Sequence, residues 1–506
     1  MAKPSEKLAE SLEALHALQA KGRVAIRSAD LARPHRERLV KNGFLQEVMK
    51  GWYIPTRPDD KAGESTAWYA SFWDFCAAYL EERFGKKWCL SPEQSLFLHI
   101  GKKTVPAQLV VRAPEAHNNT TSLPHKTSLL EVRLSVPEKR NAVTNENLRL
   151  FSLPAALISA TLNFFTQYST DARVALSSVR DASEVLELLL EGGNSIVAGR
   201  LAGAFRNIGR RRLADDVLKG MKAAGYAVRE SDPFAAQSLF VFPNRPESPY
   251  VSRMRLMWQD MREPILARFP KAKGLPKNTA AYLKRLDEVY VTDAYHSLSI
   301  EGYRVSRELI ERVRGGKWNP DLNKADKSHR DALAARGYWQ AFQAVKESVS
   351  EVLKGKNAGQ VADEAHGDWY RELFSPSVSA GLLRPSDLAG YRNHPVYIRN
   401  SKHVPPSYES VRDLMPAFFD LLREEKEGAV RAVLGHFIFV YIHPYMDGNG
   451  RTGRFLMNVM LASGGYPWTV IPVERRSEYM KALEKASVEQ DIAPFANFLA
   501  ELVTSQ

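Results

Sequence analysis

The chain has 506 residues, more than one ordinary hydrophobic core holds, so we expect about three domains. Hydrophobic residues make up 44% of it and charged residues 25%, which is an ordinary globular composition. No apolar run approaches the roughly 18 to 20 residues that a membrane span needs. The polar amino terminus lacks the apolar core of a secretory signal. These features exclude an integral membrane protein and favour a soluble protein of the cytoplasm with no membrane partner.

The net charge and the cysteine content restrict the partners and metal sites. A formal net charge of +12 favours a polyanionic partner such as nucleic acid, although a solvated basic surface gives the same charge. Cys76 and Cys89 are the two cysteines, too few for a disulfide framework or a thiolate metal site. We expect both to be reduced residues of the core.

The first 58 residues predict three short helices followed by a hairpin. Leucines recur at helical spacing in residues 5–19, a second helix follows the capping residue Ser28, and a third follows Pro34. Residues 45–54 predict a hairpin that turns near Lys50 and Gly51. This order is typical of a winged helix-turn-helix. The residues that would contact DNA are Arg33, Arg36, Arg38, Lys41 and Lys50. A protein-interaction module with a basic solvent face is the alternative.

Residues 59–242 predict a mixed α/β domain. An aromatic helical segment precedes short strands at residues 108–112 and 129–133, and two basic helices joined near residues 207–209 close the region. The basic residues of these helices would contact phosphate or form a solvated face. A proline-rich stretch, residues 243–249, separates this region from a mainly helical one. We therefore place domains at residues 1–58, 59–242 and 243–506.

The segment from His443 to Arg454 carries the clearest chemical pattern. It joins two apolar helical segments, so its second half lies at a helix amino terminus. A backbone of Gly448, Asn449 and Gly450 can approach an anion closely and direct several N–H groups to it. Arg451 and Arg454 lie three residues apart, on one helix face, where both can reach the phosphates of one nucleotide. This pattern predicts a phosphate cradle.

Two further residues of the segment supply reactive groups. Asp447 is its only acidic residue, and beside a triphosphate it would be the natural ligand for Mg²⁺, which takes few carboxylates. His443 has an ordinary pKa near 6.5, so it can accept a proton from a hydroxyl at neutral pH. A lone histidine is usually structural, but the combination of these residues favours catalysis.

This segment resembles the motif of the Fic (Fic/Doc) family, although the usual phenylalanine at its third position is Tyr445 here. The resemblance implies an all-α domain with a catalytic core at about 385–502 that transfers AMP from ATP to a Ser, Thr or Tyr hydroxyl of a target protein. His443 would then be the base and Asp447 the magnesium ligand. The residues that would bind ATP are Gly448, Asn449, Gly450, Arg451, Gly453, Arg454 and, near the adenine, Tyr479.

Two upstream segments resemble other Fic elements. Ser297, Glu301 and Gly302 match the family's inhibitory pattern, which implies an inhibitory helix at about 285–302 whose Glu301 pairs with Arg454 and misplaces ATP. Ser297 and Glu301 are one helical turn apart, on the same face. The residues that resemble the β-hairpin flap, which docks the target as an added strand, are Val396, Tyr397 and Ile398. Ordinary strand packing would give the same alternation.

The amino-terminal half resembles a second family. Residues 22–31, 50–53 and 198–209 are similar to AbiEi-type antitoxins of type IV toxin–antitoxin systems, over about the first 230 residues. That family carries a winged helix that binds operator DNA. The resemblance therefore implies DNA as a partner.

Together these patterns predict a multidomain, mainly α protein that is an AMP transferase inhibited by Glu301 and fused to a DNA-binding regulator. Its substrate would be ATP with Mg²⁺, its partners a target protein and DNA, and a homodimer is expected because Fic domains often self-associate. The alternatives are a DNA-binding antitoxin or regulator whose Fic domain senses nucleotide, removal of AMP from modified protein, and transfer of another phosphate-containing group.

Overall fold

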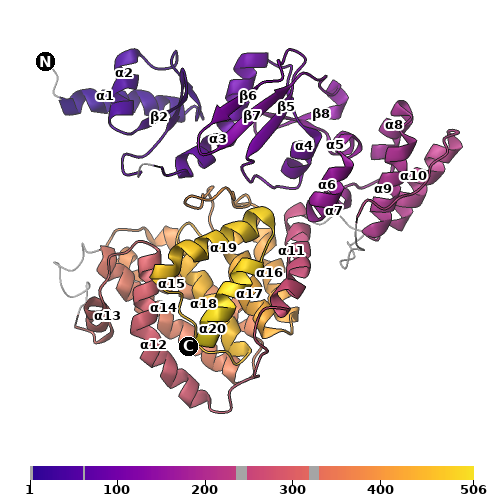
Figure 1. Cartoon of the computed structure of the whole chain (residues 1–506). Helices are drawn as coiled ribbons and strands as arrows, with labels where there is room; N and C mark the ends of the chain where they lie inside the picture. Colours follow the sequence, from indigo (N-terminus) through magenta and orange to yellow (C-terminus); the bar gives the residue numbers. More distant parts are fainter. Residues whose placement is uncertain (1–3, 61–62, 235–247, 318–329, 506) are drawn as a thin grey trace. The chain divides into compact units, whose positions relative to one another are not determined.

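The computed structural model describes residues 4–60, 63–234, 248–317 and 330–505. The chain divides into two compact units (Figure 1). The first unit comprises Met1–Pro249 and Tyr397–Val404, and the second comprises Tyr250–Val396 and Pro405–Gln506. The boundary expected between residues 242 and 243 lies outside the described residues.

Residues 4–60 form two helices and a small antiparallel sheet with the strand order β1-β3-β2. Leu15, Leu39 and Leu45 are buried between them. The hairpin expected near Lys50 and Gly51 is confirmed, because β2 and β3 pair on either side of these residues. The elements are α1 (Pro4–Gln19), β1 (Ile26–Arg27), α2 (Arg33–Lys41), β2 (Leu45–Met49) and β3 (Trp52–Pro55).

The helix expected after Ser28 is absent, so that prediction was wrong. The Ser28 N–H donates to the carbonyl oxygen of Gly51 instead, which ties it to the sheet. The Asp30 carboxylate then accepts the N–H of Arg27 at 2.9 Å and closes a turn. Asp and Ser side chains favour such local bonds over helix, which explains the turn at this position.

The middle of the first unit contains a mixed sheet with the strand order β4-β5-β7-β6, in which β5 and β7 are parallel. The two strands expected near residues 108–112 and 129–133 are confirmed as β5 and β7. Trp68, Phe72 and Phe75 of α3 are buried in the core of this region. The elements are α3 (Thr66–Phe84), β4 (Cys89–Leu90), α4 (Pro92–His99), β5 (Gln108–Arg112), β6 (Thr120–Leu123), β7 (Thr127–Val132), η1 (Lys139–Asn141), β8 (Ala142–Asn145) and β9 (Leu148–Phe151).

The helices that follow include the expected basic pair, α9 and α10, joined at residues 208–210. Some basic side chains of these helices form ion pairs within the fold. Arg206 pairs with Glu230 at 2.7 Å and with Asp215 at 2.8 Å. Arg210 is buried and donates to the carbonyl oxygen of Ser177. The elements are α5 (Leu153–Ser159), α6 (Leu162–Gln167), α7 (Ser169–Ser177), α8 (Ser183–Gly192), α9 (Ser195–Asn207) and α10 (Arg211–Ala223).

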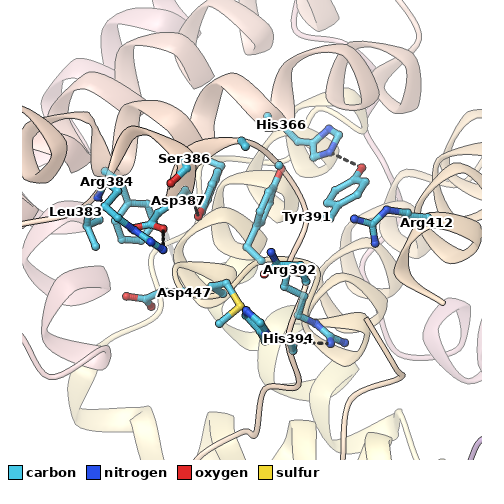
Figure 2. Close-up of a pocket in the computed structure, with 18 residues that line it drawn as sticks. His366, Leu383, Arg384, Ser386, Asp387, Tyr391, Arg392, His394, Arg412 and Asp447 are labelled. Atoms are coloured by element: carbon cyan, nitrogen blue, oxygen red, sulfur yellow. Dashed lines mark hydrogen bonds and ion pairs between the residues drawn. The ribbon is translucent and has the colours of Figure 1, made fainter. Parts of the chain in front are cut away.

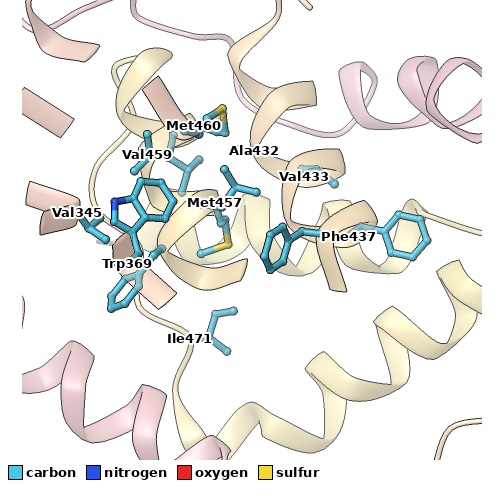
Figure 3. Packing of buried hydrophobic residues seen from close by; sticks show 14 of the residues in the cluster. Val345, Trp369, Ala432, Val433, Phe437, Met457, Val459, Met460 and Ile471 are labelled. Carbon is cyan, nitrogen blue, oxygen red and sulfur yellow. The ribbon is translucent and has the colours of Figure 1, made fainter. Parts of the chain in front are cut away.

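The second unit is helical, and α17 and α18 are its most buried helices. A helix that is apolar on all sides must lie in a core, and α17 meets that condition. Figure 3 shows Phe437 of α17 packed near Met457 of α18 and Trp369 of α15. The elements are α11 (Pro249–Leu266), α12 (Thr279–Ile300), α13 (Arg307–Arg314), α14 (Arg330–Leu353), α15 (Ala358–Ser379), η3 (Pro385–Leu388), α16 (Val411–Glu424), α17 (Gly428–Ile442), α18 (Asn449–Ser463), η4 (Val473–Arg475), α19 (Arg476–Glu489) and α20 (Ala493–Ser505).

The flap was expected to be a β-hairpin, but residues 389–410, all of them described, contain no strand. Backbone carbonyls of this segment take a different partner. Those of His394 and Pro406 accept hydrogen bonds from the buried guanidinium of Arg392. Since a side chain supplies these bonds, the backbone there needs no strand partner.

Among the described residues, no helix combines the length and the apolar character that a bilayer span would require. Cys76 and Cys89 are free and buried, as expected.

Candidate active site

His443 lies where α17 ends and the loop to α18 begins. Its backbone is left-handed at φ 54°, a conformation that ends a helix, and the next residue is a proline, which disfavours a continued helix. The ring Nδ1 lies 3.0 Å from the carbonyl oxygen of Val440. Because a carbonyl only accepts hydrogen bonds, Nδ1 carries the proton and Nε2 keeps its lone pair. His443 is therefore arranged to act as a base through Nε2.

The surroundings of His443 keep its imidazole neutral. Burial is the main cause that holds its pKa below the ordinary value, and the positive charge of Arg392 lowers it further. The hydrogen bond to Val440 and the carboxylates of Glu301 and Asp447 act in the opposite direction without reversing the shift. A neutral imidazole at pH 7 is the state that a general base requires.

Arg392 fixes the backbone of the same loop, a role that the sequence did not reveal. The residue is 1% exposed, and its Nε donates to the carbonyl oxygen of His443 at 2.8 Å. Its Nη2 donates to Ile442 and Pro406, and its backbone N–H donates to Pro444 at 2.9 Å. Burial lowers the pKa of Arg392 to about 10, so it remains charged at neutral pH. One buried cation thus holds several carbonyls around the histidine.

Asn449 closes the loop from its other end. Its side-chain amide accepts the N–H of Tyr445 and donates to the carbonyl oxygen of Tyr445, both at 2.8 Å. The Tyr445 ring stacks on that of Tyr370, with centroids 3.9 Å apart and planes at 5°. We expected the side chain of Asn449 at the phosphates. In the structure it is buried and binds the backbone of Tyr445 within the loop. The tyrosine that replaces the usual phenylalanine fills a packing position.

The glycines of the loop are required by close contacts. Gly448 has φ 77°, and a Cβ there would lie 2.8 Å from Cε2 of Phe374. A Cβ on Gly450 would lie 2.3 Å from Oε1 of Glu301. The Glu301 carboxylate therefore lies against the first turn of α18, where unpaired N–H groups and the helix dipole favour an anion. The position expected for a phosphate is occupied here by a side-chain anion.

Arg454 is bound by the end of α12. Its Nε donates to Oγ of Ser297 at 2.8 Å, and its Nη2 donates to the Ser297 carbonyl oxygen at 3.0 Å and to Oε1 of Glu301 at 2.8 Å. Ser297 and Glu301 lie one turn apart on α12, as their spacing predicted. Gly302 has φ 88°, a left-handed conformation that ends the helix and suits glycine. The predicted pairing of Glu301 with Arg454 is present.

The charges of this pair stabilise each other. Burial opposes the ionised form of Glu301, but the positive charges of Arg454 and then Arg451 outweigh it and lower the pKa of this carboxyl. Burial also opposes the charge of Arg454, yet Glu301 keeps the pKa of its guanidinium above the usual value. Both groups are therefore charged at neutral pH, and the pair is an ion pair.

Asp447 differs from Glu301 in its exposure. Its side chain is 65% exposed, and Oδ1 accepts the N–H of Gly448 and lies 3.7 Å from Nη2 of Arg451. The described part of the chain holds no group of three or more His, Cys, Asp or Glu side chains that could bind a metal. Asp447 is thus a single accessible carboxylate beside the first turn of α18, where the sequence predicts a phosphate cradle.

Tyr479 and Gly453, both expected at the nucleotide, lie in the core. The Tyr479 side chain is 1% exposed, and its hydroxyl lies 2.6 Å from Nε2 of His436. A Cβ on Gly453 would lie 3.2 Å from Nδ1 of His436. In this conformation the two residues support the packing of α17 and α18 rather than offering a surface to a ligand.

Asp293 is a second residue that the sequence did not reveal. It lies on α12 four residues before Ser297, is 5% exposed, and accepts a hydrogen bond from the hydroxyl of Tyr338 at 2.6 Å. Burial raises the pKa of Asp293 to about 6, although Tyr338, Trp468 and the charge of Arg454 act against the rise. Asp293 lies within a helical pattern, so the sequence gave no sign that its carboxyl would be buried and have a raised pKa.

A pocket of about 850 Å³ adjoins the loop (Figure 2). Asp447 lies on one side of it, and α15 contributes His366, which is hydrogen-bonded to the hydroxyl of Tyr391 at 2.9 Å. Arg384 and Asp387 form an ion pair at another side. The pocket therefore offers both aromatic and charged groups next to the candidate catalytic loop.

The flap candidates fall on either side of a unit boundary. Val396 belongs to the second unit, whereas Tyr397 and Ile398 belong to the segment Tyr397–Val404 of the first. Within the first unit, the Lys402 carbonyl oxygen accepts the N–H of Val105 at 3.0 Å. Tyr397 is 43% exposed.

The DNA-contact candidates divide into engaged and accessible residues. Arg36 donates to the carbonyl oxygen of Ser28 at 2.8 Å, and Arg38 donates to Oγ of Ser11 at 2.7 Å, so both hold the fold together. Arg33 is exposed and forms an ion pair with Glu37, its neighbour one helical turn away. Lys41 and Lys50 are exposed.

Comparison with known proteins finds one family model and several curated relatives. Residues 364–461 match the model of the Fic/DOC family. The chain is 28% identical over 281 residues to "Protein adenylyltransferase Fic" of Drosophila willistoni, covering 54% of this chain and 52% of the relative. It is 38% identical over 218 residues to the protein of the same description from Drosophila mojavensis, covering 42% and 40%. The chain thus spans about half the length of the curated relatives it matches.

Among solved structures, "Fic-1 (aa134 - 508) from C. elegans" aligns with 67% of this chain and 94% of its own, at 19% identity and a TM-score of 0.38. The family match includes the loop from His443 to Arg454. The segment that is similar to the Fic/DOC family therefore runs from α15 to α18 and contains the candidate catalytic loop.

Proposed function

We propose that the Fic/DOC domain is a protein adenylyltransferase, which transfers AMP from ATP to a Ser, Thr or Tyr hydroxyl of another protein. One observation carries this proposal: a neutral histidine with a free Nε2 lies in the loop that leads directly into the amino terminus of α18. The loop lies within the segment that matches the Fic/DOC family model, and the chain is similar to relatives described as protein adenylyltransferases.

The residues divide the reaction between them. Nε2 of His443 takes the proton of the target hydroxyl, whose oxygen attacks the α-phosphorus of ATP. The new bond joins that oxygen to phosphorus, the bond from the α-phosphorus to the bridging oxygen breaks, and pyrophosphate leaves. Backbone N–H groups of Asn449 and Gly450 in the first turn of α18, together with Arg451 and Arg454, stabilise the phosphate charge. Arg392 and Asn449 keep the loop in shape.

Asp447 fits the magnesium role expected of it. A single accessible carboxylate is what Mg²⁺ requires when water and substrate phosphates supply its other ligands. When bound, the ion would neutralise phosphate charge. Asp447 itself would orient the ion, while its Oδ1 keeps Gly448 in place.

We further propose that Glu301 inhibits the domain. Its carboxylate lies over the first turn of α18 and holds Arg454, so it takes both the anion position and one of the phosphate-binding cations. An incoming triphosphate would have to displace it, at the cost of a partly buried ion pair. The same carboxylate could orient a water molecule for removal of AMP, which keeps that reaction as an alternative.

For the amino-terminal region we propose DNA contact through the exposed Lys41, Lys50 and Arg33 of an AbiEi-like winged helix. The observation that favours it is that Arg33 and Lys41 are the first and last residues of α2, while Lys50 lies in the turn of the adjacent hairpin. Replacing both lysines with glutamine should weaken binding to duplex DNA and reduce the salt dependence of that binding by about two phosphate contacts. Unchanged salt dependence would contradict this.

Incubation of a Glu301→Gly variant with Mg²⁺, α-labelled ATP and cell extract tests the enzymatic proposal. Label on protein that disappears in Glu301→Gly/His443→Ala supports AMP transfer and identifies the target band. Label that persists without His443, or no label in any mixture, would favour a nucleotide-sensing regulator instead.

A further inference from the structure

Arg451 is a buried cation held mainly by aromatic rings. Its side chain is 2% exposed, and its Cζ lies 5.2 Å from the ring centroid of Tyr303 and 4.9 Å from that of Phe374. Its Nε has no hydrogen-bond partner in the described structure, and its nearest carboxylate oxygen is 3.7 Å away on Asp447. Burying a guanidinium with so few polar partners is costly, and the rings offset part of that cost.

Tyr303 comes from the same helix ending as Glu301. Gly302 reverses the chain after α12, and the Tyr303 N–H then donates to the carbonyl oxygen of Leu298 at 3.1 Å. One turn of chain therefore presents a carboxylate to Arg454 and an aromatic ring to Arg451. The inhibitory segment contacts both arginines of the phosphate cradle.

The second ring is rigidly placed. The ring centroids of Phe374 and Tyr370 lie 5.3 Å apart, and the Tyr370 ring stacks on that of Tyr445 in the loop. It also lies so close to Gly448 that a side chain there would collide with it. Because Tyr370 and Gly448 hold Phe374 in place, the position of Tyr303 decides how Arg451 is packed. Its guanidinium lies either between two rings or against Phe374 alone.

We propose that Tyr303 is a positioning residue for phosphate binding: its ring holds Arg451 in place for the phosphates of ATP, independently of the inhibition exerted by Glu301. This rests on the phosphate-binding role of Arg451 in the proposed function. The turn after α12 then has two opposite effects, since Glu301 withholds Arg454 while Tyr303 keeps Arg451 ready. A change that displaces the whole turn should therefore activate less than the loss of the Glu301 carboxylate alone.

Ligand binding separates this role from general damage. The parent is full-length Glu301→Gly/His443→Ala, which should bind ATP without turning it over, and the variants add Tyr303→Phe or Tyr303→Leu. Affinities for ATP and for adenosine are measured by calorimetry with Mg²⁺, and unfolding temperatures are measured beside them. Tyr295→Leu is the matched control, because Tyr295 lies on α12 and its ring faces Arg307.

Tyr303→Leu should weaken ATP binding about three- to thirtyfold, the range of one cation–π contact, and change adenosine binding by less than about twofold. Tyr303→Phe should retain the affinity for ATP, because the ring is kept. Equal effects of Leu and Phe, or equal losses for ATP and adenosine, would overturn the positioning role alone. No binding of ATP by the parent would instead overturn the phosphate site on which the inference rests.

Discussion

Nη2 of Arg454 and Oε1 of Glu301 lie 2.8 Å apart, although the two residues are separated by 153 positions in the sequence. The contact joins the residue that directly follows α12 to the second turn of α18. The arginine to which we assign phosphate binding is thus bound by a carboxylate in this structure. The proposed inhibition depends on competition between this carboxylate and phosphate for Arg454.

Loss of the carboxylate should activate the enzyme in a graded way. Glu301→Gly should transfer AMP at least about tenfold faster than the wild type, the factor that corresponds to about 1.4 kcal/mol. Glu301→Gln should lie between them, because it keeps a hydrogen-bond acceptor but not the charge. Initial rates with α-labelled ATP measure this. Glu308→Gly, at an exposed glutamate of α13, is the control, and activation by that change too would contradict the mechanism.

Activity should fall on the acid side because His443 must be neutral. Burial holds the pKa of this imidazole below its ordinary 6.5, so kcat/KM of Glu301→Gly should be level near pH 7 and fall only at a pH below 6.5. His443→Ala should reduce the rate by about 10² to 10⁴ at the plateau. A pH–rate profile measures the midpoint, and one above 6.5 would contradict the buried, neutral base.

Arg392 should matter for stability as well as for activity. Arg392→Leu leaves several buried carbonyls around His443 without a donor, at about 1 to 3 kcal/mol for each group that water does not reach. Unfolding by denaturant should show a loss of at least about 2 kcal/mol. Arg412→Leu, at an arginine that also lines the pocket, should change stability little (Figure 2). Similar losses of stability for both variants would contradict the proposal that Arg392 holds the loop carbonyls in place.

Asp293 should make stability depend on pH. Its pKa is raised to about 6 in the folded state by burial, so the folded protein binds this proton more tightly than the unfolded chain does. Its contribution is then favourable below pH 4 and is lost as the pH rises through 6, by about 3 kcal/mol in total. Asp293→Asn keeps an acceptor for Tyr338 but does not titrate. The stability of the variant relative to the wild type should therefore rise between pH 4 and pH 7.

The sequence predicted the elements whose signals are local. The apolar α17 and the glycine-rich entry into α18 follow from spacing, whereas the long-range pairing of Glu301 with Arg454 was implied by the resemblance to the Fic family. It failed where a long-range partner decides the structure. Ser28 bonds to Gly51 and forms no helix cap, and the guanidinium of Arg392 binds the carbonyls of His394 and Pro406 in a segment that forms no strand.

Burial likewise could not be read from residue type. Arg36 and Arg38 have the composition of DNA contacts, but carbonyl and hydroxyl acceptors close in space engage them. Tyr479 matches a family position near the adenine, yet its hydroxyl lies against the buried His436. In each case the sequence identified the residue, and the packing around it decided what its side chain contacts.

The most direct measurement compares the fate of two labels with Glu301→Gly and a purified target. ATP labelled at the α-phosphate should label the target, ATP labelled at the γ-phosphate should not, and one pyrophosphate should be released for each AMP attached. The wild type should attach the α-label and release pyrophosphate more slowly. Glu301→Gly/His443→Ala should neither label the target nor release pyrophosphate. Label from the γ-phosphate on the target, or α-label that does not depend on His443, would contradict AMP transfer by this site.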